Sequence, residues 1–187
     1  MAHKVAELLQ AAGLPDGLFQ IIHGDRDIGA ALCAHPGIAK ILLTGGVETG
    51  RLIMAQSAQS LKKITLELGG KSPLLVFEDC DFELAIQTAL DANFYTGPEV
   101  CSNATRVFVQ RSIADDLIAA MTTRTKTMRV SDPMASETQM GALISKRHLA
   151  KVLGYVKLGV DEGESIVTGG NALQPQGFEN GYFMQPT

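Results

Sequence analysis

The sequence predicts an α/β protein that begins with a parallel sheet and crossover helices. Two observations predict this fold class. Helical and strand-like patterns alternate from Lys4 to Leu68, and the predicted strands in this stretch are short apolar runs. Regular alternation of helices and strands is typical of parallel sheets with right-handed crossovers.

The elements up to Leu68 follow from local signals. Gly13, with Pro15 beyond it, predicts the end of the first helix. Asp27 predicts a helix N-cap, and Pro36-Gly37 ends the helix that follows. The expected elements are a helix over 4–12, a strand over 18–22, a helix over 27–34, a strand over 38–43, a helix over 47–60 and a strand over 63–68.

After Pro73 the same kinds of signal continue. Polar turns at Asp79–Asp81, Ser112 and Ser145 each predict a helix start, and Gly97-Pro98 predicts a loop. The expected elements are a strand over 74–77, a helix over 82–94, a loop over 95–103, a strand over 105–109, a helix over 112–128, a helix over 146–161, a strand over 166–168 and a loop-rich tail over 171–187.

Composition excludes several classes of function. The net charge of −4 provides no basic surface for phosphates, so we expect no nucleic-acid partner. No apolar run is long enough to span a bilayer, and we expect no membrane partner. Three cysteines are too few and too widely spaced for a disulfide framework or a zinc site, which favours the cytoplasm. No pair of the four histidines, His3, His23, His35 and His148, has the spacing of metal ligands, so we expect them at the surface or in turns.

A glycine-rich turn joins the strand over 38–43 to the next helix. Free N–H groups at a helix start bind phosphate or pyrophosphate well, although this turn lacks the GxGxxG spacing of dinucleotide sites. A plain strand-to-helix turn explains the same residues, and the pattern leaves both interpretations open. The candidate cofactor-binding residues are Gly45, Gly46, Val47, Glu48 and Gly50.

Cys101 and Glu67 are the two candidate catalytic residues. Cys101 follows the loop with Gly97-Pro98, where a reactive thiol is plausible. A buried apolar role is the commoner one for a free cysteine, and it suits Cys33 and Cys80. Glu67 ends an apolar strand at the carboxyl edge of the predicted sheet, where ligands of open α/β sheets bind.

Two motifs resemble those of the aldehyde dehydrogenase superfamily. The run Leu-Glu-Leu-Gly-Gly-Lys-Ser-Pro over 66–73 resembles its glutamate motif, and Val-Cys-Ser-Asn-Ala-Thr-Arg over 100–106 resembles its nucleophile motif. The resemblance extends from Lys4 to Thr187, and the residues over 35–58 are most similar to the betaine aldehyde dehydrogenases. It implies the later half of a Rossmann-like NAD-binding domain over 1–70, followed by part of an α/β catalytic domain over 71–187.

The resemblance also implies a mechanism. Cys101 would attack an aldehyde to give a thiohemiacetal, and NAD would accept hydride to leave a thioester. Glu67 would activate the water that hydrolyses the thioester. The substrate would be betaine aldehyde, oxidised to glycine betaine.

A cofactor site and an ion site come from the same resemblance. NAD, or NADP, would lie against the turn over 45–48, with Gly50 in the helix start and Gly69 beside the nicotinamide. The Leu61 backbone would contribute to a potassium site. Family members assemble as homo-oligomers, either dimers or tetramers. The expected partners are therefore further copies of the chain and a small aldehyde substrate.

The sequence departs from the family pattern before the nucleophile. Pro98-Glu99 stands where a Gly-Gln pair is usual, so Glu99 places a negative charge two residues from the thiol, which disfavours the thiolate or attracts a trimethylammonium group. We expect the isolated chain of 187 residues to be catalytically poor. An inactive or weakly nucleotide-binding module, and an interaction protein that pairs with other subunits, are the alternatives.

Overall fold

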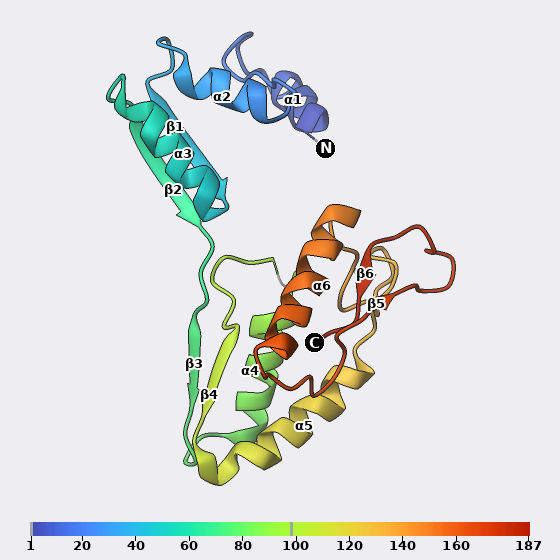
Figure 1. Cartoon of the computed structure of the whole chain (residues 1–187). Helices are drawn as coiled ribbons and strands as arrows, with labels where there is room; N and C mark the ends of the chain where they lie inside the picture. The colour runs from blue at the N-terminus through green and yellow to red at the C-terminus, as the bar shows by residue number, and fades with distance from the viewer. Residues whose placement is uncertain (1, 98) are drawn as a thin grey trace. The chain divides into compact units, whose positions relative to one another are not determined.

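The computed structural model describes residues 2–97 and 99–187 and has the helices and parallel strand pairs of an α/β protein (Figure 1). Pro98, which belongs to the Gly97-Pro98 pair that predicts the loop over 95–103, lies outside the described residues. The helices are α1 Ala2–Ala11, α2 Arg26–Ala34, α3 Val47–Ala58, α4 Phe82–Phe94, the short 3-10 helix η1 Arg111–Ile113, α5 Ala114–Thr127 and α6 Lys146–Asp161. The strands are β1 Lys40–Gly45, β2 Lys63–Leu68, β3 Pro73–Val76, β4 Arg106–Val109, β5 Ala172–Leu173 and β6 Phe183–Met184.

The chain divides into two compact units, one up to Leu68 and one from Gly69 onward. In the first unit, β1 and β2 form a parallel pair in which Lys40 lies opposite Lys63 and Gly45 opposite Leu68. Helix α3 runs along this pair in Figure 1. The parallel crossover from β1 through α3 to β2 confirms the predicted arrangement.

A buried lysine holds the segment before β1 in place. Only 8% of the Lys62 surface is exposed, and its ammonium group donates to the carbonyl oxygens of His35 at 2.7 Å and Ile38 at 2.9 Å. These two carbonyls follow the C-terminus of α2, where a positive charge is favourable. Lys62 therefore ties the turn between α2 and β1 to the start of β2.

Two predictions for the first unit are wrong. Residues 18–22 form no strand but a turn and extended chain, because the structure gives this apolar run no neighbouring strand to pair with among the described residues. The N-cap of α2 is Asp25, not Asp27. The Asp25 carboxylate accepts a hydrogen bond from the Asp27 N–H at 3.1 Å, so Asp27 lies in the first turn instead.

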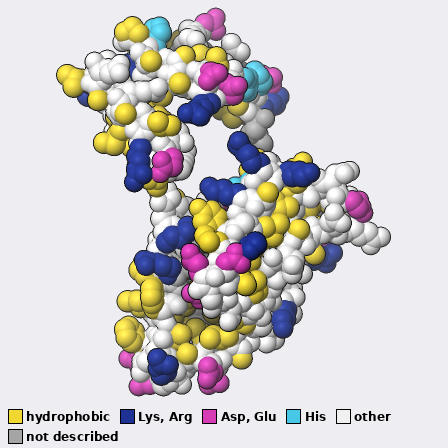
Figure 2. Space-filling view, viewed as in Figure 1, with side chains coloured by type: hydrophobic (Ala, Val, Ile, Leu, Met, Phe, Trp, Pro, Cys, Tyr) yellow, Lys and Arg dark blue, Asp and Glu magenta, His cyan; other side chains and the backbone are white. Residues whose placement is uncertain are grey.

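In the second unit, β3 and β4 pair in parallel, with α4 and α5 against one face (Figure 1). The core of this layer contains Ile86 and Leu90 from α4 and Leu117 from α5, packed against Val107 and Val109 of β4. Side chains alternate between the two faces of a strand, so Phe108, which lies between Val107 and Val109, points away from this core. Leu75, its partner in β3, does the same. Figure 2 shows hydrophobic side chains at the surface of this unit, and the exposed ones from this region include Leu75, Phe77 and Phe108.

The second unit also differs from the prediction in three places. Ser112 does not cap α5: its hydroxyl donates to a Glu78 carboxylate oxygen at 2.6 Å, and a turn of 3-10 helix precedes α5. Residues 166–168 form no strand. The strands at this end of the chain are β5 and β6, an antiparallel pair in the expected loop-rich tail. Phe183 of β6 is buried against Val130 and Met140. This packing favours strand formation in the tail and not at residues 166–168.

Candidate active site

The carboxyl edge of the β1–β2 pair brings Glu67 beside the glycine-rich turn. The parallel register places Glu67 opposite Thr44, the residue before Gly45. Leu66 and Leu68 approach α3, so Glu67, which alternates with them, lies on the opposite face of the strand pair and is exposed. A carboxylate and a candidate phosphate-binding turn are therefore neighbours at the edge where α/β sheets bind ligands.

The turn itself is a helix start with open backbone donors. Gly46 is the N-cap of α3 and makes no side-chain capping bond, and the first backbone bond of the helix runs from the Gly50 N–H to the Gly46 carbonyl at 3.1 Å. The N–H groups of Val47 and Glu48 precede that bond, and a Cβ atom at Gly46 would meet nothing within 4 Å. Glu48 itself pairs with Arg51 at 3.0 Å on the helix surface. These residues fit a pyrophosphate-containing cofactor such as NAD.

Gly50 has a packing role that the sequence did not indicate. It is buried, and a Cβ atom there would lie 3.0 Å from both Cδ atoms of Leu68 and 3.6 Å from a Cδ atom of Leu66. The absence of a side chain lets α3 approach β2 closely. Contact between Gly50 and a cofactor stays a prediction.

Cys101 lies on an exposed turn of the second unit. Of the three free cysteines, Cys33 is buried, Cys80 is partly buried and Cys101 is exposed, as expected for a thiol that meets a substrate. The Cys101 carbonyl accepts a hydrogen bond from the Gly70 N–H at 3.2 Å. A Cβ atom at Gly70 would lie 3.4 Å from the same oxygen, so a glycine suits this close approach. A Cβ atom at Gly69 would meet nothing within 4 Å, which leaves space beside this residue.

Asn93, near the end of α4, holds the chain after Cys101. Its side-chain amide donates to the carbonyls of Ala89 at 2.7 Å and Ala104 at 3.0 Å. Asn103, which is buried, donates in turn to the Asn93 carbonyl at 3.5 Å. Asn93 was not among the residues that the sequence indicated, because an asparagine near a helix end has no distinctive local pattern.

Further contacts fix the exit from this loop to β4. The Asn103 N–H donates to the Val100 carbonyl at 3.2 Å, and the Arg106 guanidinium donates through Nε to the Lys71 carbonyl at 2.7 Å. Arg106 also lies over the Phe108 ring, 5.6 Å from its centroid. The loop that holds Cys101 is thus anchored to α4 on one side and to residues 70–71 on the other.

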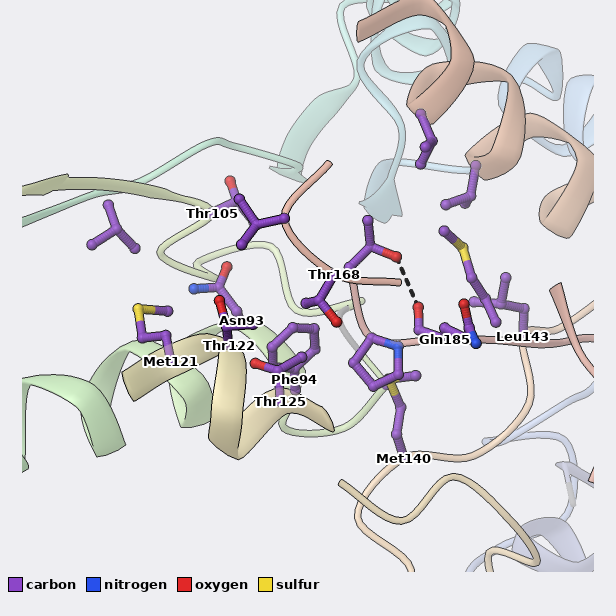
Figure 3. A pocket seen from close by; sticks show the side chains of 18 of the residues that line it. Asn93, Phe94, Thr105, Met121, Thr122, Thr125, Met140, Leu143, Thr168 and Gln185 are labelled. Atoms are coloured by element: carbon purple, nitrogen blue, oxygen red, sulfur yellow. Dashed lines mark hydrogen bonds between the residues drawn. The ribbon is translucent and has the colours of Figure 1, made fainter. Parts of the chain in front are cut away.

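The second unit contains an open cavity of about 850 Å³ among α4, α5, α6 and the tail (Figure 3). Figure 3 shows Asn93 and Phe94 from α4 beside Met121, Thr122 and Thr125 from α5. Glu99 is among the lining residues and Cys101 is not, so this cavity is not built around the Cys101 thiol.

Among the described residues, the carboxyl groups of Glu137 and Glu179 have shifted pKa values, and both lie outside the loop that holds Cys101. The Glu137 backbone N–H, the Ser136 hydroxyl and the Arg129 guanidinium hold the pKa of the Glu137 carboxyl below its ordinary value. The backbone N–H groups of Glu179 and Gly177 lower the pKa of the Glu179 carboxyl in the same way. Both groups are exposed, so we assign their shifts to local turn structure.

The expected potassium position has an unusual backbone. Leu61 has a positive φ of 50° and is 90% exposed. Within residues 2–97 and 99–187, no three His, Cys, Asp or Glu side chains are grouped to hold a metal ion. No helix in the same residues is long and apolar enough to cross a membrane.

The two candidate catalytic residues belong to different units, Glu67 to the first and Cys101 to the second. The first unit contains the glycine-rich turn and Glu67, and the second contains the loop with Cys101. That Glu67 and Cys101 act together stays a prediction.

Known proteins similar to this chain include several aldehyde dehydrogenases. The betaine aldehyde dehydrogenases of Vibrio vulnificus and Brucella ovis are 48% and 50% identical to it over 186 residues. The 4-trimethylaminobutyraldehyde dehydrogenase A of Danio rerio is 48% identical over 187 residues. These matches cover 99–100% of the chain but only 37–38% of each relative.

Solved structures agree with the sequence relatives. The betaine aldehyde dehydrogenase of Staphylococcus aureus in complex with NAD⁺ matches with a TM-score of 0.95 and 35% identity, over 100% of this chain and 37% of that one. HpcC from Thermus thermophilus matches with a TM-score of 0.96 and 38% identity, over the same shares. The aldehyde dehydrogenase family also matches residues 1–187, so the chain belongs to the aldehyde dehydrogenase family.

Proposed function

We propose that this chain takes part in the NAD-dependent oxidation of an aldehyde to a carboxylic acid. The observation that supports this most directly is the register of β1 and β2, which places Glu67 beside the open helix start at Gly46. The family match over 1–187 supports the same reaction. Because the chain spans about 38% of its curated relatives, their activity applies to it as a proposal.

Four residues have proposed roles in the reaction. The Cys101 thiolate attacks the aldehyde carbon, and the new bond between sulfur and carbon gives a thiohemiacetal. The open N–H groups of Val47 and Glu48 hold the cofactor pyrophosphate. NAD, when bound, supplies the acceptor for the hydride that this adduct loses. Glu67 then takes a proton from water, and hydrolysis of the Cys101 thioester releases the acid and restores the thiol.

The substrate that we propose is betaine aldehyde. Two observations favour a cationic aldehyde. The names of two groups of relatives specify trimethylammonium aldehydes, and Glu99 is an exposed carboxylate two residues before Cys101. A carboxylate near the site attracts a quaternary ammonium and disfavours uncharged aldehydes of the same shape. Potassium at the exposed Leu61 backbone and assembly with further copies of the chain are part of the same proposal.

The test is NADH formation by the purified chain with NAD and betaine aldehyde. We expect slow turnover that Cys101→Ala abolishes. Glu67→Gln should form about one NADH per chain and then stop, because the thioester would not hydrolyse. If the unchanged chain forms no NADH, the hypothesis that this chain catalyses the reaction by itself is wrong. In that case, NAD binding measured by calorimetry would distinguish a nucleotide-binding module from an interaction protein.

Substrate preference has its own control. 3,3-Dimethylbutanal has the shape of betaine aldehyde but no charge. We expect the unchanged chain to prefer betaine aldehyde and Glu99→Gln to reduce that preference by about tenfold or less, since the carboxylate is exposed and solvent screens its charge. Equal rates with the two aldehydes would contradict the assignment of a cationic substrate.

A further inference from the structure

Two histidines that are distant in the sequence meet in the first unit. His3 lies in α1 and His23 lies in the segment before α2, and both are exposed. Their Nε2 atoms are 2.8 Å apart. The ring centroids are 4.5 Å apart, and the ring planes are inclined at 51°. Both histidines lie at the surface, as predicted, and the contact between them is a feature that their spacing in the sequence did not indicate.

The two rings are not collinear through the contact between their Nε2 atoms. If the two rings lay end to end along one straight hydrogen bond, their centroids would be about 5 Å apart, since the ring radius adds about 1.1 Å at each end. The observed 4.5 Å is shorter, so the rings are bent toward each other about the Nε2 contact. Bent in this way, both Nε2 lone pairs can be directed at a third atom beside the contact.

In the absence of an ion, the 2.8 Å contact is a hydrogen bond in which either ring can be the donor. The same separation also fits metal coordination. Two nitrogens bound to one ion at about 2.0–2.1 Å lie about 2.9 Å apart when the angle at the ion is a right angle, and about 3.4 Å apart when it is tetrahedral. The observed 2.8 Å corresponds to the right angle. Right-angle geometry is that of Cu²⁺ and Ni²⁺ with nitrogen ligands, whereas Zn²⁺ prefers the tetrahedron.

We propose that His3 and His23 form a two-histidine binding site for a divalent transition-metal ion, with Ni²⁺ or Cu²⁺ favoured over Zn²⁺. Glu7, one helical turn after His3, pairs with Lys4 at 2.9 Å and is not a third ligand in this arrangement. Because both imidazoles are exposed, water completes the coordination. A bound ion would link α1 to the segment before α2 and so stabilise the first unit by mass action.

Calorimetric titration of the untagged chain with Ni²⁺ near neutral pH tests this proposal. Parallel titrations in Cys101→Ser remove the exposed thiol as a competing ligand. We expect one ion per chain, with micromolar affinity, and at least about a tenfold loss of affinity in both His3→Ala and His23→Ala. The matched control is His35→Ala, another exposed histidine of the same unit, and it should leave the affinity unchanged.

A spectroscopic measurement adds a second readout. The electron paramagnetic resonance spectrum of Cu²⁺ bound to the Cys101→Ser chain should show two equivalent nitrogen ligands. Each single histidine variant should reduce this number to one. Absence of binding, or binding that neither His3→Ala nor His23→Ala weakens, would overturn the proposal and indicate an adventitious ion only. Binding of Zn²⁺ at least as tight as that of Ni²⁺ would overturn the assignment of right-angle geometry.

Discussion

Replacing Asn93 by leucine tests whether this residue holds the loop that contains Cys101. Leucine has nearly the same size and shape but cannot donate to the carbonyls of Ala89 and Ala104. Each lost hydrogen bond costs about 1 kcal/mol net, and the Ala104 carbonyl, which is partly buried, loses a partner. We expect Asn93→Leu to lower the free energy of unfolding by about 2 kcal/mol, measured by urea denaturation.

The same substitution should loosen the loop that holds Cys101. A loss of about 2 kcal/mol from local opening corresponds to roughly a thirtyfold faster amide hydrogen exchange. We expect this increase in peptides that cover 100–106 and not in peptides of α6. Hydrogen exchange measured by mass spectrometry gives the comparison.

Gln87→Leu is the matched control. Gln87 lies on the same helix and is exposed, and its amide bonds only to Asp91 at 2.9 Å. Its replacement should change the free energy of unfolding by less than about 0.5 kcal/mol. If Asn93→Leu is no more destabilising than Gln87→Leu and exchange over 100–106 is unchanged, Asn93 does not hold the loop.

Three further substitutions test the packing and charge arguments. Lys62→Met leaves two carbonyls without the ammonium donor and should lower the free energy of unfolding by about 2–4 kcal/mol, measured by urea denaturation. Lys63→Met changes an exposed residue and should lower it by under about 0.5 kcal/mol. Equal losses would refute the anchoring role of Lys62. Ile86→Ala removes a fully buried side chain and should lower the free energy of unfolding by about 2–4 kcal/mol. Leu84→Ala, at an exposed position of the same helix, should lower it by under about 1 kcal/mol. Similar losses would show that the core is not where we place it. Because the pKa of Glu137 is lowered in the folded chain, its contribution to stability is full above the ordinary glutamate pKa and is lost as the pH falls through the folded value. Glu137→Gln should therefore destabilise the chain at neutral pH and lose this effect in acid, and an effect that persists in acid would contradict the assigned cause.

Local signals in the sequence predicted most of the elements and several of their ends. The strand over 63–68 and the helices over 82–94 and 146–161 begin and end as predicted. Asp81 and Ser145 cap their helices, accepting hydrogen bonds from the backbone N–H three residues later at 3.0 and 3.1 Å. These features depend on side chains within one helical turn of each other, so a single sequence contains the necessary information.

Local signals failed where two outcomes had similar local energies. Asp25 and Asp27 are both good caps, and only the structure shows which of them α2 uses. Ser112 has the residue type of a cap but bonds to Glu78, 34 positions earlier in the chain. The apolar runs over 18–22 and 166–168 resemble strands, but a strand forms only where a neighbouring strand accepts its hydrogen bonds.

The sequence by itself determined the fold class, the parallel pairing of the strands before and after α3, the motifs that indicate the aldehyde dehydrogenase family, and the residue types needed for thiol chemistry. The tertiary structure alone decided that Glu67 lies opposite Thr44, that Asn93 holds the loop after Cys101, and that His3 meets His23. The physical reason is the range of the forces involved. Turns, caps and periodic apolar patterns act over a few residues, whereas register and side-chain contacts between distant segments depend on how whole faces pack together.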